Sequence, residues 1–334
     1  MDALRFCVVG AGAIGGFVGA RLALGGHDVT FLARGRTLEA IRAAGIEVRE
    51  PDGGVHRASV RGIDAPDGKE RFDVVMLALK AYDIAAVAPR VEALCHEETM
   101  VVPMQNGIPF WYFNGHGGAL AGTAVQSVDP GGRIRDAIAA RRILGCVVYV
   151  ACEQAGPGRI VHVNNQRLIL GEPDGTASAR VQALAAACER SGFQAPVIPD
   201  IRNEIWLKAW GNLSFNPVSA LTGATLGAIC NDPQGRELVA EMMREASAVA
   251  ARLGVTFRVS IEKRIEGAAR VGAHKTSMLQ DVEAGRAMEV DALVGSVVEL
   301  GQLVGVATPT ISAIYRAAKL LDATRRSPAP LPRG

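Results

Sequence analysis

Three polar side chains, Lys208, Asn212 and Asn216, follow one another at intervals of four residues in an otherwise apolar segment. At 3.6 residues per turn, positions i, i+4 and i+8 form one stripe along a helix. A helix that is apolar on its other faces is normally buried, so its polar groups need partners in the interior. Burial disfavours the charged form of a lysine, which suits that lysine to act as a general acid, and two carboxamides can hold a small acid. The stripe therefore predicts a site in which Lys208 protonates an oxygen of a hydroxy- or oxo-acid.

The residues around this stripe favour a buried site over a solvated polar face. Asparagine is a poor helix former, so two asparagines on one stripe are costly unless they bind something. Pro217 displaces the hydrogen bond to the Leu213 carbonyl, and we expect the helix to kink or end there. Five large apolar side chains leave little of this segment for solvent: Trp206, Leu207, Trp210, Leu213 and Phe215.

A second cluster with chemical meaning is the glycine-rich sequence Gly10-Ala11-Gly12-Ala13-Ile14-Gly15, which matches GxGxxG. It follows an apolar run at 4–9 that is typical of a strand, and it opens a segment at 13–25 that is typical of a helix. In this context the first glycine permits a tight turn, the second lets the backbone approach a pyrophosphate, and the third lets the helix pack against the strand. The motif predicts dinucleotide binding; the alternative is a glycine-rich turn without a ligand.

The end of the second expected strand, at 27–32, indicates which dinucleotide is bound. Sites for NAD usually place Asp or Glu there to bind the ribose hydroxyls. This chain has Arg34 and Arg36 and no acid at that point. An arginine can pair with a 2′-phosphate in a bidentate way, so we expect the cofactor NADP. The alternative is that both arginines are solvated surface charges.

Two further polar residues follow expected strands. Lys80 follows the apolar run 72–79, and Asn106 follows the shorter run 99–102. Ligands of parallel α/β sheets bind at the carboxyl ends of the strands. We therefore expect Lys80 to neutralise phosphate and Asn106 to reach the nicotinamide end. The alternatives are an exposed loop charge and a plain Asn-Gly turn.

These residues require a framework that positions them. Up to about residue 200 the patterns predict four strands (4–9, 27–32, 72–79, 99–102), a hairpin (46–60), a three-stranded meander (144–151, 159–163, 167–170) and helices (13–25, 37–44, 84–94, 177–191). Beyond it only helical patterns occur (201–216, 231–253, 258–271, 276–284, 288–304, 309–324). We predict an α/β fold: a Rossmann-type doubly wound parallel sheet at 1–199, an all-helical substrate and catalytic domain at 200–326, and a flexible tail at 327–334.

Composition narrows the classes of function. With 36 Lys and Arg against 34 Asp and Glu, the net charge of +2 argues against nucleic-acid binding. Six cysteines without CxxC and six histidines without HExxH predict no metal site and reduced thiols in a cytoplasmic protein. The apolar stretches 6–20 and 292–307 are interpreted as the glycine-rich motif and a buried helix, so no membrane segment is expected. We expect a small-molecule substrate and a monomer or homodimer.

Taken together, the motifs resemble those of the ketopantoate reductases, or 2-dehydropantoate 2-reductases. The similarity runs from Gly10 to about Ala318 and keeps its order. Besides the glycine-rich motif, it comprises Ala-Arg at 33–34, Leu-Lys-Ala at 79–81, Gln-Asn-Gly at 105–107, Trp-x-Lys-x-x-x-Asn-x-x-x-Asn-Pro at 206–217, Thr-Ser-Met-Leu-Gln-Asp at 276–281 and Glu-Val-Asp at 289–291.

The resemblance implies NADPH-dependent reduction of 2-dehydropantoate to pantoate, in pantothenate and coenzyme A synthesis. It implies that Lys208 donates the proton and that Asn106, Asn212, Asn216 and Ser277 bind the substrate. It implies NADP contacts at Gly10, Ala11, Gly12, Ala13, Ile14, Gly15, Arg34, Lys80, Asn106, Ala151 (through its backbone, at the end of a strand) and Glu289. Without the resemblance, Ser277 would be interpreted as a helix cap and Glu289 as a helix acid in the first turn.

Two departures from the family pattern leave alternatives open. Leu226 stands where the family often has another asparagine, so one substrate hydrogen bond is missing or replaced. The segment 108–142 contains the aromatic tetrad 110–113, which is either a packing cluster or dimer contact, or a remodelled lid for a bulkier 2-oxo acid. The alternative functions are accordingly a related 2-hydroxy-acid dehydrogenase and a non-catalytic NADP-binding sensor. A sensor would not need a buried proton donor.

Overall fold

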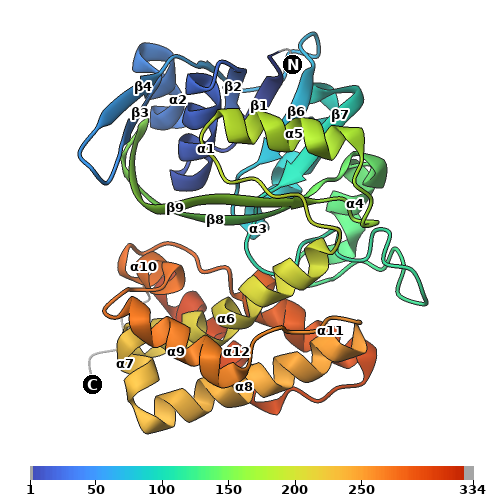
Figure 1. The fold of residues 1–334 in the computed structure, drawn as a ribbon, viewed down its shortest axis with the longest axis vertical. Helices are drawn as coiled ribbons and strands as arrows, with labels where there is room; N and C mark the ends of the chain where they lie inside the picture. The colour runs from blue at the N-terminus through green and yellow to red at the C-terminus, as the bar shows by residue number, and fades with distance from the viewer. Residues whose placement is uncertain (1–2, 327–334) are drawn as a thin grey trace, which may run out of the picture. The chain divides into compact units, whose positions relative to one another are not determined.

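The computed structural model describes residues 3–326, which form two compact units. The first unit holds the residues up to 105 together with 109–124 and 129–201. The second holds 106–108, 125–128 and the residues from 202 on. Figure 1 shows the course of the chain through the elements of both. The division at 199/200 stays a prediction, and the predicted flexible tail at 327–334 lies outside the described residues.

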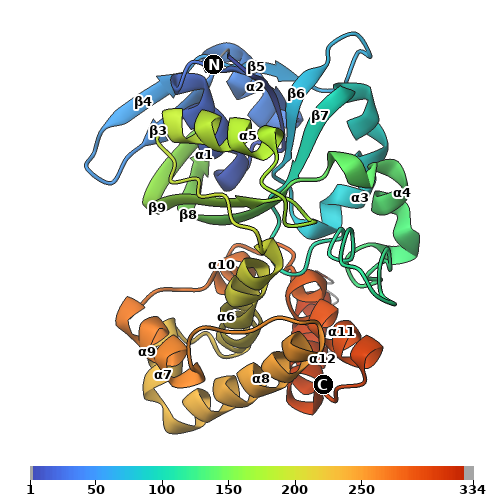
Figure 2. The same ribbon diagram turned by 45° about the vertical axis from the view of Figure 1, so that its right-hand side comes forward.

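A five-stranded parallel sheet forms the centre of the first unit (Figure 2). The strand order is β5-β2-β1-β6-β7. From β1 the chain adds β2 and β5 on one side of the sheet, and it then crosses over and adds β6 and β7 on the other side. The predicted apolar runs are buried, as expected for strands covered on both faces. The very short β5 was not predicted. The strands are β1 (Arg5–Val9), β2 (Asp28–Leu32), β5 (Arg61–Ile63), β6 (Phe72–Leu77) and β7 (Cys95–Pro103).

A second sheet of order β4-β3-β9-β8 belongs to the same unit. The hairpin predicted at 46–60 is confirmed as the antiparallel pair β3 (Ile46–Arg49) and β4 (Val55–Ala58). The predicted meander is wrong, because the chain forms one long hairpin of β8 (Gly145–Gly156) and β9 (Arg159–Gly171). The polar stretches that suggested breaks are largely exposed parts of these strands. The pairing of β8 with β9 is irregular in these stretches: its register shifts, and Asn165 has a positive φ of 63°.

Helix α1 (Ala13–Leu24) lies between the two sheets, and its glycines make this position possible (Figure 1). A Cβ atom at Gly16 would lie 2.8 Å from the Ile160 side chain of β9. A Cβ atom at Gly19 would lie 2.2 Å from the Phe31 ring of β2. The remaining helices of this unit are α2 (Gly35–Ala44), α3 (Ala81–Val91), α4 (Arg133–Ala137) and α5 (Ala179–Arg190).

The second unit is helical, as predicted. Its longest helix, α6, runs through Pro217 to Thr222, so the predicted end at 216 is wrong. The missing N–H costs one backbone hydrogen bond, but buried residues on both sides of the proline, such as Phe215 and Val218, keep this turn in the interior. The elements are α6 (Ile201–Thr222), α7 (Leu226–Asn231), α8 (Pro233–Arg252), α9 (Ile261–Val271), α10 (Ser277–Glu283), the π-helical turn η4 (Asp291–Gly295), α11 (Ser296–Val304) and α12 (Pro309–Arg326).

The aromatic tetrad is part of the core of the first unit. All four side chains, from Phe110 to Phe113, are no more than 3% exposed. The Tyr112 and Phe113 rings pack edge to face at 5.0 Å. Burial of this kind favours the packing cluster over a lid.

Among the helices of the described residues, none is long and apolar enough to cross a membrane.

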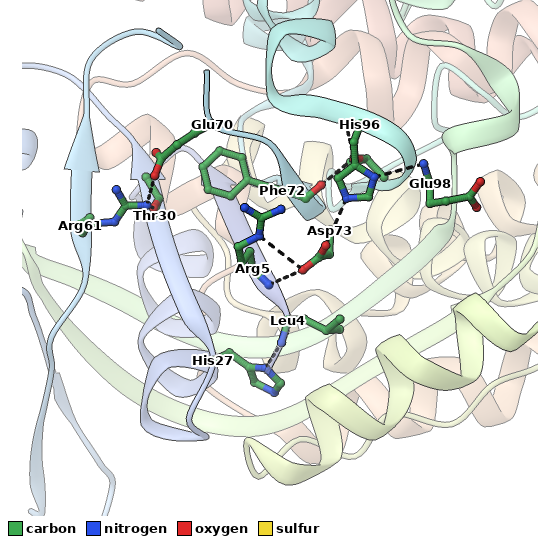
Figure 3. Close-up of polar contacts among 11 residues, drawn as sticks. Leu4, Arg5, His27, Thr30, Arg61, Glu70, Phe72, Asp73, His96 and Glu98 are labelled. Carbon is green, nitrogen blue, oxygen red and sulfur yellow. Dashed lines mark hydrogen bonds and ion pairs between the residues drawn. The ribbon is translucent and has the colours of Figure 1, made fainter. Parts of the chain in front are cut away.

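Hydrogen bonds and ion pairs of polar side chains link the strands of the first unit near their amino ends (Figure 3). Asp73 at the start of β6 accepts a hydrogen bond from the Arg5 N–H at 2.7 Å and lies 3.1 Å from His96 Nε2. Arg61 of β5 pairs with Glu70 at 2.8 Å and donates to Thr30 Oγ1 of β2. These contacts hold the sheet at the edge opposite to the glycine-rich turn.

His27 belongs to this edge and accepts a hydrogen bond there through one of its ring nitrogens. Its Nδ1 accepts a hydrogen bond from the Leu4 N–H at 3.1 Å (Figure 3), so that nitrogen carries no proton. Burial lowers the pKa of His27, and the nearby Arg190 guanidinium lowers it further, while a hydrogen bond to the Ala187 carbonyl opposes both. Protonation of His27 would break the contact with the first residue before β1.

We expect this histidine to make the stability of the protein depend on pH. Because its pKa is lower in the folded state, the unfolded chain binds the extra proton first. The stabilisation is therefore complete above about pH 6.5 and is lost as the pH falls, by at most about 1.4 kcal/mol per pH unit. In His27→Asn the Oδ1 atom keeps an acceptor for Leu4 but does not titrate. Urea unfolding between pH 7.5 and 5 should show a steeper loss in the wild type, and equal slopes would contradict this role.

Candidate active site

The glycine-rich turn after β1 has two glycines that the protein itself requires. Gly10 has φ +99°, a conformation that favours glycine, and a Cβ atom there would lie 2.7 Å from the Ala78 carbonyl oxygen. A Cβ atom at Gly15 would lie 2.0 Å from the Gly10 carbonyl oxygen. The first and third glycines thus allow the turn and the close packing that the motif predicts.

Gly12 differs because nothing in the described part of the chain requires a glycine there. A Cβ atom at this position would meet nothing within 4 Å, and φ is −73°. Gly12 is also the N-cap of α1; no side chain of the described residues caps it, and the first turn of α1 holds no acid. An uncapped helix N-terminus with open space before it is suited to bind an anion. The residues present therefore fit the pyrophosphate of a dinucleotide.

The two glycines should respond to alanine in opposite ways. Gly12→Ala is expected to leave the free energy of unfolding almost unchanged and to weaken dinucleotide binding more than about tenfold, because the methyl group occupies the space for phosphate. Gly15→Ala is expected to lower the free energy of unfolding by about 3 kcal/mol, because the backbone must move. Urea unfolding and calorimetric titration with NADPH measure both quantities. Undiminished binding by Gly12→Ala would refute the phosphate site.

Arg34 and Lys80 occupy corresponding places on neighbouring parts of the sheet. Arg34 is exposed and is the N-cap residue of α2, directly beyond β2. Lys80 is half-buried and is the N-cap residue of α3, beyond β6. Since the strand order is β2-β1-β6, the two cations flank the glycine-rich turn along the carboxyl edge of the sheet. This arrangement provides positive charge on both sides of a bound pyrophosphate.

Ala151 does not lie at the end of a strand, which corrects the prediction. It lies within β8, where the pairing with β9 shifts register on both sides of it. A shift of this kind leaves local backbone groups outside the regular ladder. The expectation that the backbone of Ala151 contacts the cofactor is untested by this finding.

Helix α6 presents the polar stripe within the second unit. Asn216 is buried, whereas Lys208 and Asn212 are half-buried, so the expected full burial of the lysine is wrong. The tryptophans fix the other faces of the helix. Trp206 is fully buried, and Trp210 donates to the Met243 carbonyl at 2.9 Å and stacks on Phe257 at 4.2 Å. The stripe therefore lies on a helix whose tryptophans are packed in the interior of the second unit.

The structure brings Asn106 and the segment of Glu289 together in the second unit. Gly107 has φ +84°, and a Cβ atom there would lie 2.1 Å from the Ala292 carbonyl oxygen. The same oxygen accepts a hydrogen bond from the Ile108 N–H at 3.1 Å. Glu289 is buried, and its carbonyl oxygen begins the helical turn that contains Ala292 by accepting from the Leu293 N–H. The end of the Gln-Asn-Gly motif thus lies against Ala292, the residue that directly follows the Glu-Val-Asp motif.

The Thr-Ser-Met-Leu-Gln-Asp segment caps and anchors α10. The cap is Thr276, whose Oγ1 accepts from the Leu279 N–H at 3.2 Å, so interpreting Ser277 as the cap would have been wrong. Ser277 is exposed, which leaves its hydroxyl available to a ligand. Asp281 is buried and pairs with Arg286 at 2.9 Å.

Sequence reasoning missed several polar residues near these segments. Gln105 was part of a quoted motif, but only its neighbour Asn106 was selected. The Asp291 carboxylate accepts hydrogen bonds from the Tyr315 hydroxyl at 2.6 Å and from Lys319 Nζ at 2.9 Å. These contacts fix the π-helical turn. Glu299 accepts hydrogen bonds from the N–H groups of Gln126 and Ser127. No local pattern indicates such distant partners.

Five of the six cysteines are buried, and Cys152 is half-buried. All six are free thiols. Burial raises the pKa of Cys7 to about 12, that of Cys95 to about 11 and that of Cys152 to about 12. Among the described residues, no group of three or more His, Cys, Asp or Glu side chains could hold a metal ion.

The parallel sheet with its glycine-rich turn defines a Rossmann-like fold, followed by a helical unit. Two family models match this chain: "Ketopantoate reductase PanE/ApbA" over residues 6–175 and "Ketopantoate reductase PanE/ApbA C terminal" over residues 200–322. The chain belongs to the ketopantoate reductase family and is an oxidoreductase, which confirms the resemblance seen in its motifs.

Individual relatives agree with the family models. The chain is 49% identical over 323 residues to the 2-dehydropantoate 2-reductase of Mesorhizobium japonicum, covering 96% of this chain and 99% of the relative. A crystal structure from Ralstonia solanacearum MolK2, provisionally assigned as a ketopantoate reductase, has 44% identity, a TM-score of 0.93 and coverage of 97% and 99%. A D-mandelate dehydrogenase with NADH and anilino(oxo)acetate shares the fold at 19% identity, with a TM-score of 0.84 and coverage of 97% and 99%.

Proposed function

We propose that this protein catalyses the NADPH-dependent reduction of 2-dehydropantoate to pantoate, a step of pantothenate and coenzyme A synthesis. The observation that carries the proposal is the polar stripe of Lys208, Asn212 and Asn216 on α6, a helix that also carries the buried side chains of Trp206, Trp210 and Leu213. A lysine and two carboxamides at this spacing suit a small 2-oxo acid, which offers a carbonyl and a carboxylate. The relatives named 2-dehydropantoate 2-reductase support this choice among 2-oxo acids.

We assign cofactor binding to the first unit and to two residues of the second. The residues from Gly10 to Gly15 would hold the pyrophosphate at the N-terminus of α1, and Arg34 and Lys80 would neutralise phosphate. The backbone of Ala151, together with Asn106 and Glu289, would contact the nicotinamide half. When bound, the reduced dinucleotide supplies a hydride to C2 of the 2-oxo acid.

The remaining chemistry belongs to the side chains of the second unit. The Lys208 ammonium donates its proton to the C2 oxygen, so that the carbonyl becomes a hydroxyl. Asn106, Asn212, Asn216 and Ser277 would bind the substrate and orient its carbonyl toward Lys208. Holding the reactants in this arrangement removes much of the entropic cost of the reaction. The division into a cofactor domain at 1–199 and a substrate domain at 200–326 follows these roles.

A panel of 2-oxo acids tests the substrate. The consumption of NADPH is followed with 2-dehydropantoate and with branched and aromatic 2-oxo acids, and kcat/KM should be highest for 2-dehydropantoate. A preference for a bulkier acid would instead indicate a related 2-hydroxy-acid dehydrogenase. Binding of NADPH without turnover of any acid would indicate a sensor.

A further inference from the structure

The side-chain amide of Gln105, which lies just beyond the carboxyl end of β7, has an unsatisfied hydrogen-bond acceptor. Its Oε1 is buried and makes no hydrogen bond with any part of the chain that the structure describes. A buried acceptor without a partner destabilises a fold, so native proteins seldom keep one without a reason. Gln182 of the same unit, by contrast, is exposed to solvent. A hydrogen-bond donor on a bound ligand would satisfy the Oε1 atom of Gln105.

The register of the sheet shows what lies beside Gln105. The Met104 N–H donates to the Leu77 carbonyl at 3.0 Å, which continues the pairing of β6 and β7 beyond Pro103. The pairing ends at this bond: Gln105 directly follows it on the β7 side, and Ala78, Leu79 and Lys80 follow it on the β6 side. Leu79 in turn lies against the glycine-rich turn, since a Cβ atom at Gly10 would be 2.7 Å from its Cδ2.

Gln105 is thus two strands away from the phosphate-binding turn, a distance of about 10 Å along the edge of the sheet. The order of groups along this edge is Arg34 beyond β2, the glycine-rich turn beyond β1, Lys80 beyond β6 and Gln105 beyond β7. A dinucleotide that places its pyrophosphate at the turn would extend its nicotinamide half toward β6 and β7. The ribose comes first, and the carboxamide of the ring is the group at the far end.

We propose that Gln105 Oε1 accepts a hydrogen bond from the carboxamide N–H of the nicotinamide ring. The proposal rests on the proposed function only in taking a nicotinamide dinucleotide as the cofactor. A carboxamide offers two N–H donors and matches a single buried carbonyl oxygen. Gln105 then selects a pyridine ring that bears a carboxamide, and the cofactor supplies the partner that the folded chain lacks.

Replacing Gln105 by methionine tests this assignment, because methionine keeps the length of the side chain but has no comparable acceptor. Thermal unfolding of the free protein should show an equal or higher Tm for Gln105→Met, since the unpaired acceptor is gone. Calorimetric titration with NADP⁺ should show binding weakened about tenfold. The matched control is Gln182→Met on α5, which should change neither quantity.

A dinucleotide without the donor completes the test. In 3-acetylpyridine adenine dinucleotide phosphate, a methyl group replaces the carboxamide nitrogen, so Gln105→Met and the wild type should bind it equally well. An equal loss of affinity for both dinucleotides would overturn the proposal, as would a Tm several degrees below that of the wild type. The titrations contain no 2-oxo acid, so a failed substrate panel would leave their outcome unaffected. Failure of the wild type to bind either dinucleotide would overturn both proposals.

Discussion

Lys208→Ala is expected to lower kcat by about 10²–10⁴-fold, which is the usual contribution of a positioned general acid. Without the ammonium, the C2 oxygen must take its proton from water as the hydroxyl forms. The glycine-rich turn, Arg34 and Lys80 belong to the other unit, so the affinity for NADPH should change little. Steady-state kinetics with 2-dehydropantoate and calorimetric titration with NADPH measure the two effects separately.

A second lysine of the helical unit provides the control for this experiment. Lys263 is exposed on α9, and Lys263→Ala should retain the kcat of the wild type. Asn212→Ala should mainly raise KM, because the asparagine binds the substrate without transferring a proton. If Lys208→Ala turned over like the wild type, Lys208 would not be the proton donor.

Arg34→Ala is expected to raise the KM for NADPH by about tenfold to a hundredfold, the range for hydrogen bonds to a charged group. The KM for NADH should stay almost unchanged, because NADH has no 2′-phosphate. Arg34 is exposed and its side chain does not cap α2, so the fold should tolerate the change. The ratio of kcat/KM for the two dinucleotides measures the effect.

Arg36 is the natural comparison for Arg34. It is equally exposed and lies two residues further along the chain. Arg36→Ala should therefore lower the preference for NADPH much less than Arg34→Ala. A wild type that used NADH and NADPH with equal efficiency would remove the basis of this prediction.

The elements that could be predicted from the sequence are those whose pattern is local. The runs 74–79 and 6–9 are continuously apolar because their strands are covered on both faces. The glycine-rich motif predicted its turn correctly because the close approach of Gly15 to the Gly10 carbonyl lies within the motif, although the Ala78 carbonyl that faces Gly10 comes from a distant part of the chain. The stripe on α6 follows from helical periodicity alone.

The features that could not be predicted depend on contacts between distant residues. The three-residue strand β5 is too short to carry a pattern of its own. Strand β3 pairs in parallel with residues 159–161 of β9, more than a hundred residues away, and the polar part of β9 that follows is kept extended by its pairing with β8. Asn106 meets the segment of Glu289 only because Gly107 fits against the Ala292 carbonyl. Pro217 stays within a helix because its surroundings are buried.

The interleaving of the two units along the chain has a consequence for synthesis and dissection. The helical unit includes 106–108 and 125–128, which leave the ribosome long before residue 202. A fragment that began at 202 would leave the Glu299 carboxylate without the Gln126 and Ser127 N–H groups, and the Ala292 carbonyl without the Ile108 N–H. The C-terminal half is therefore not an autonomous module, and a cut at a single linker cannot separate the protein into two intact halves.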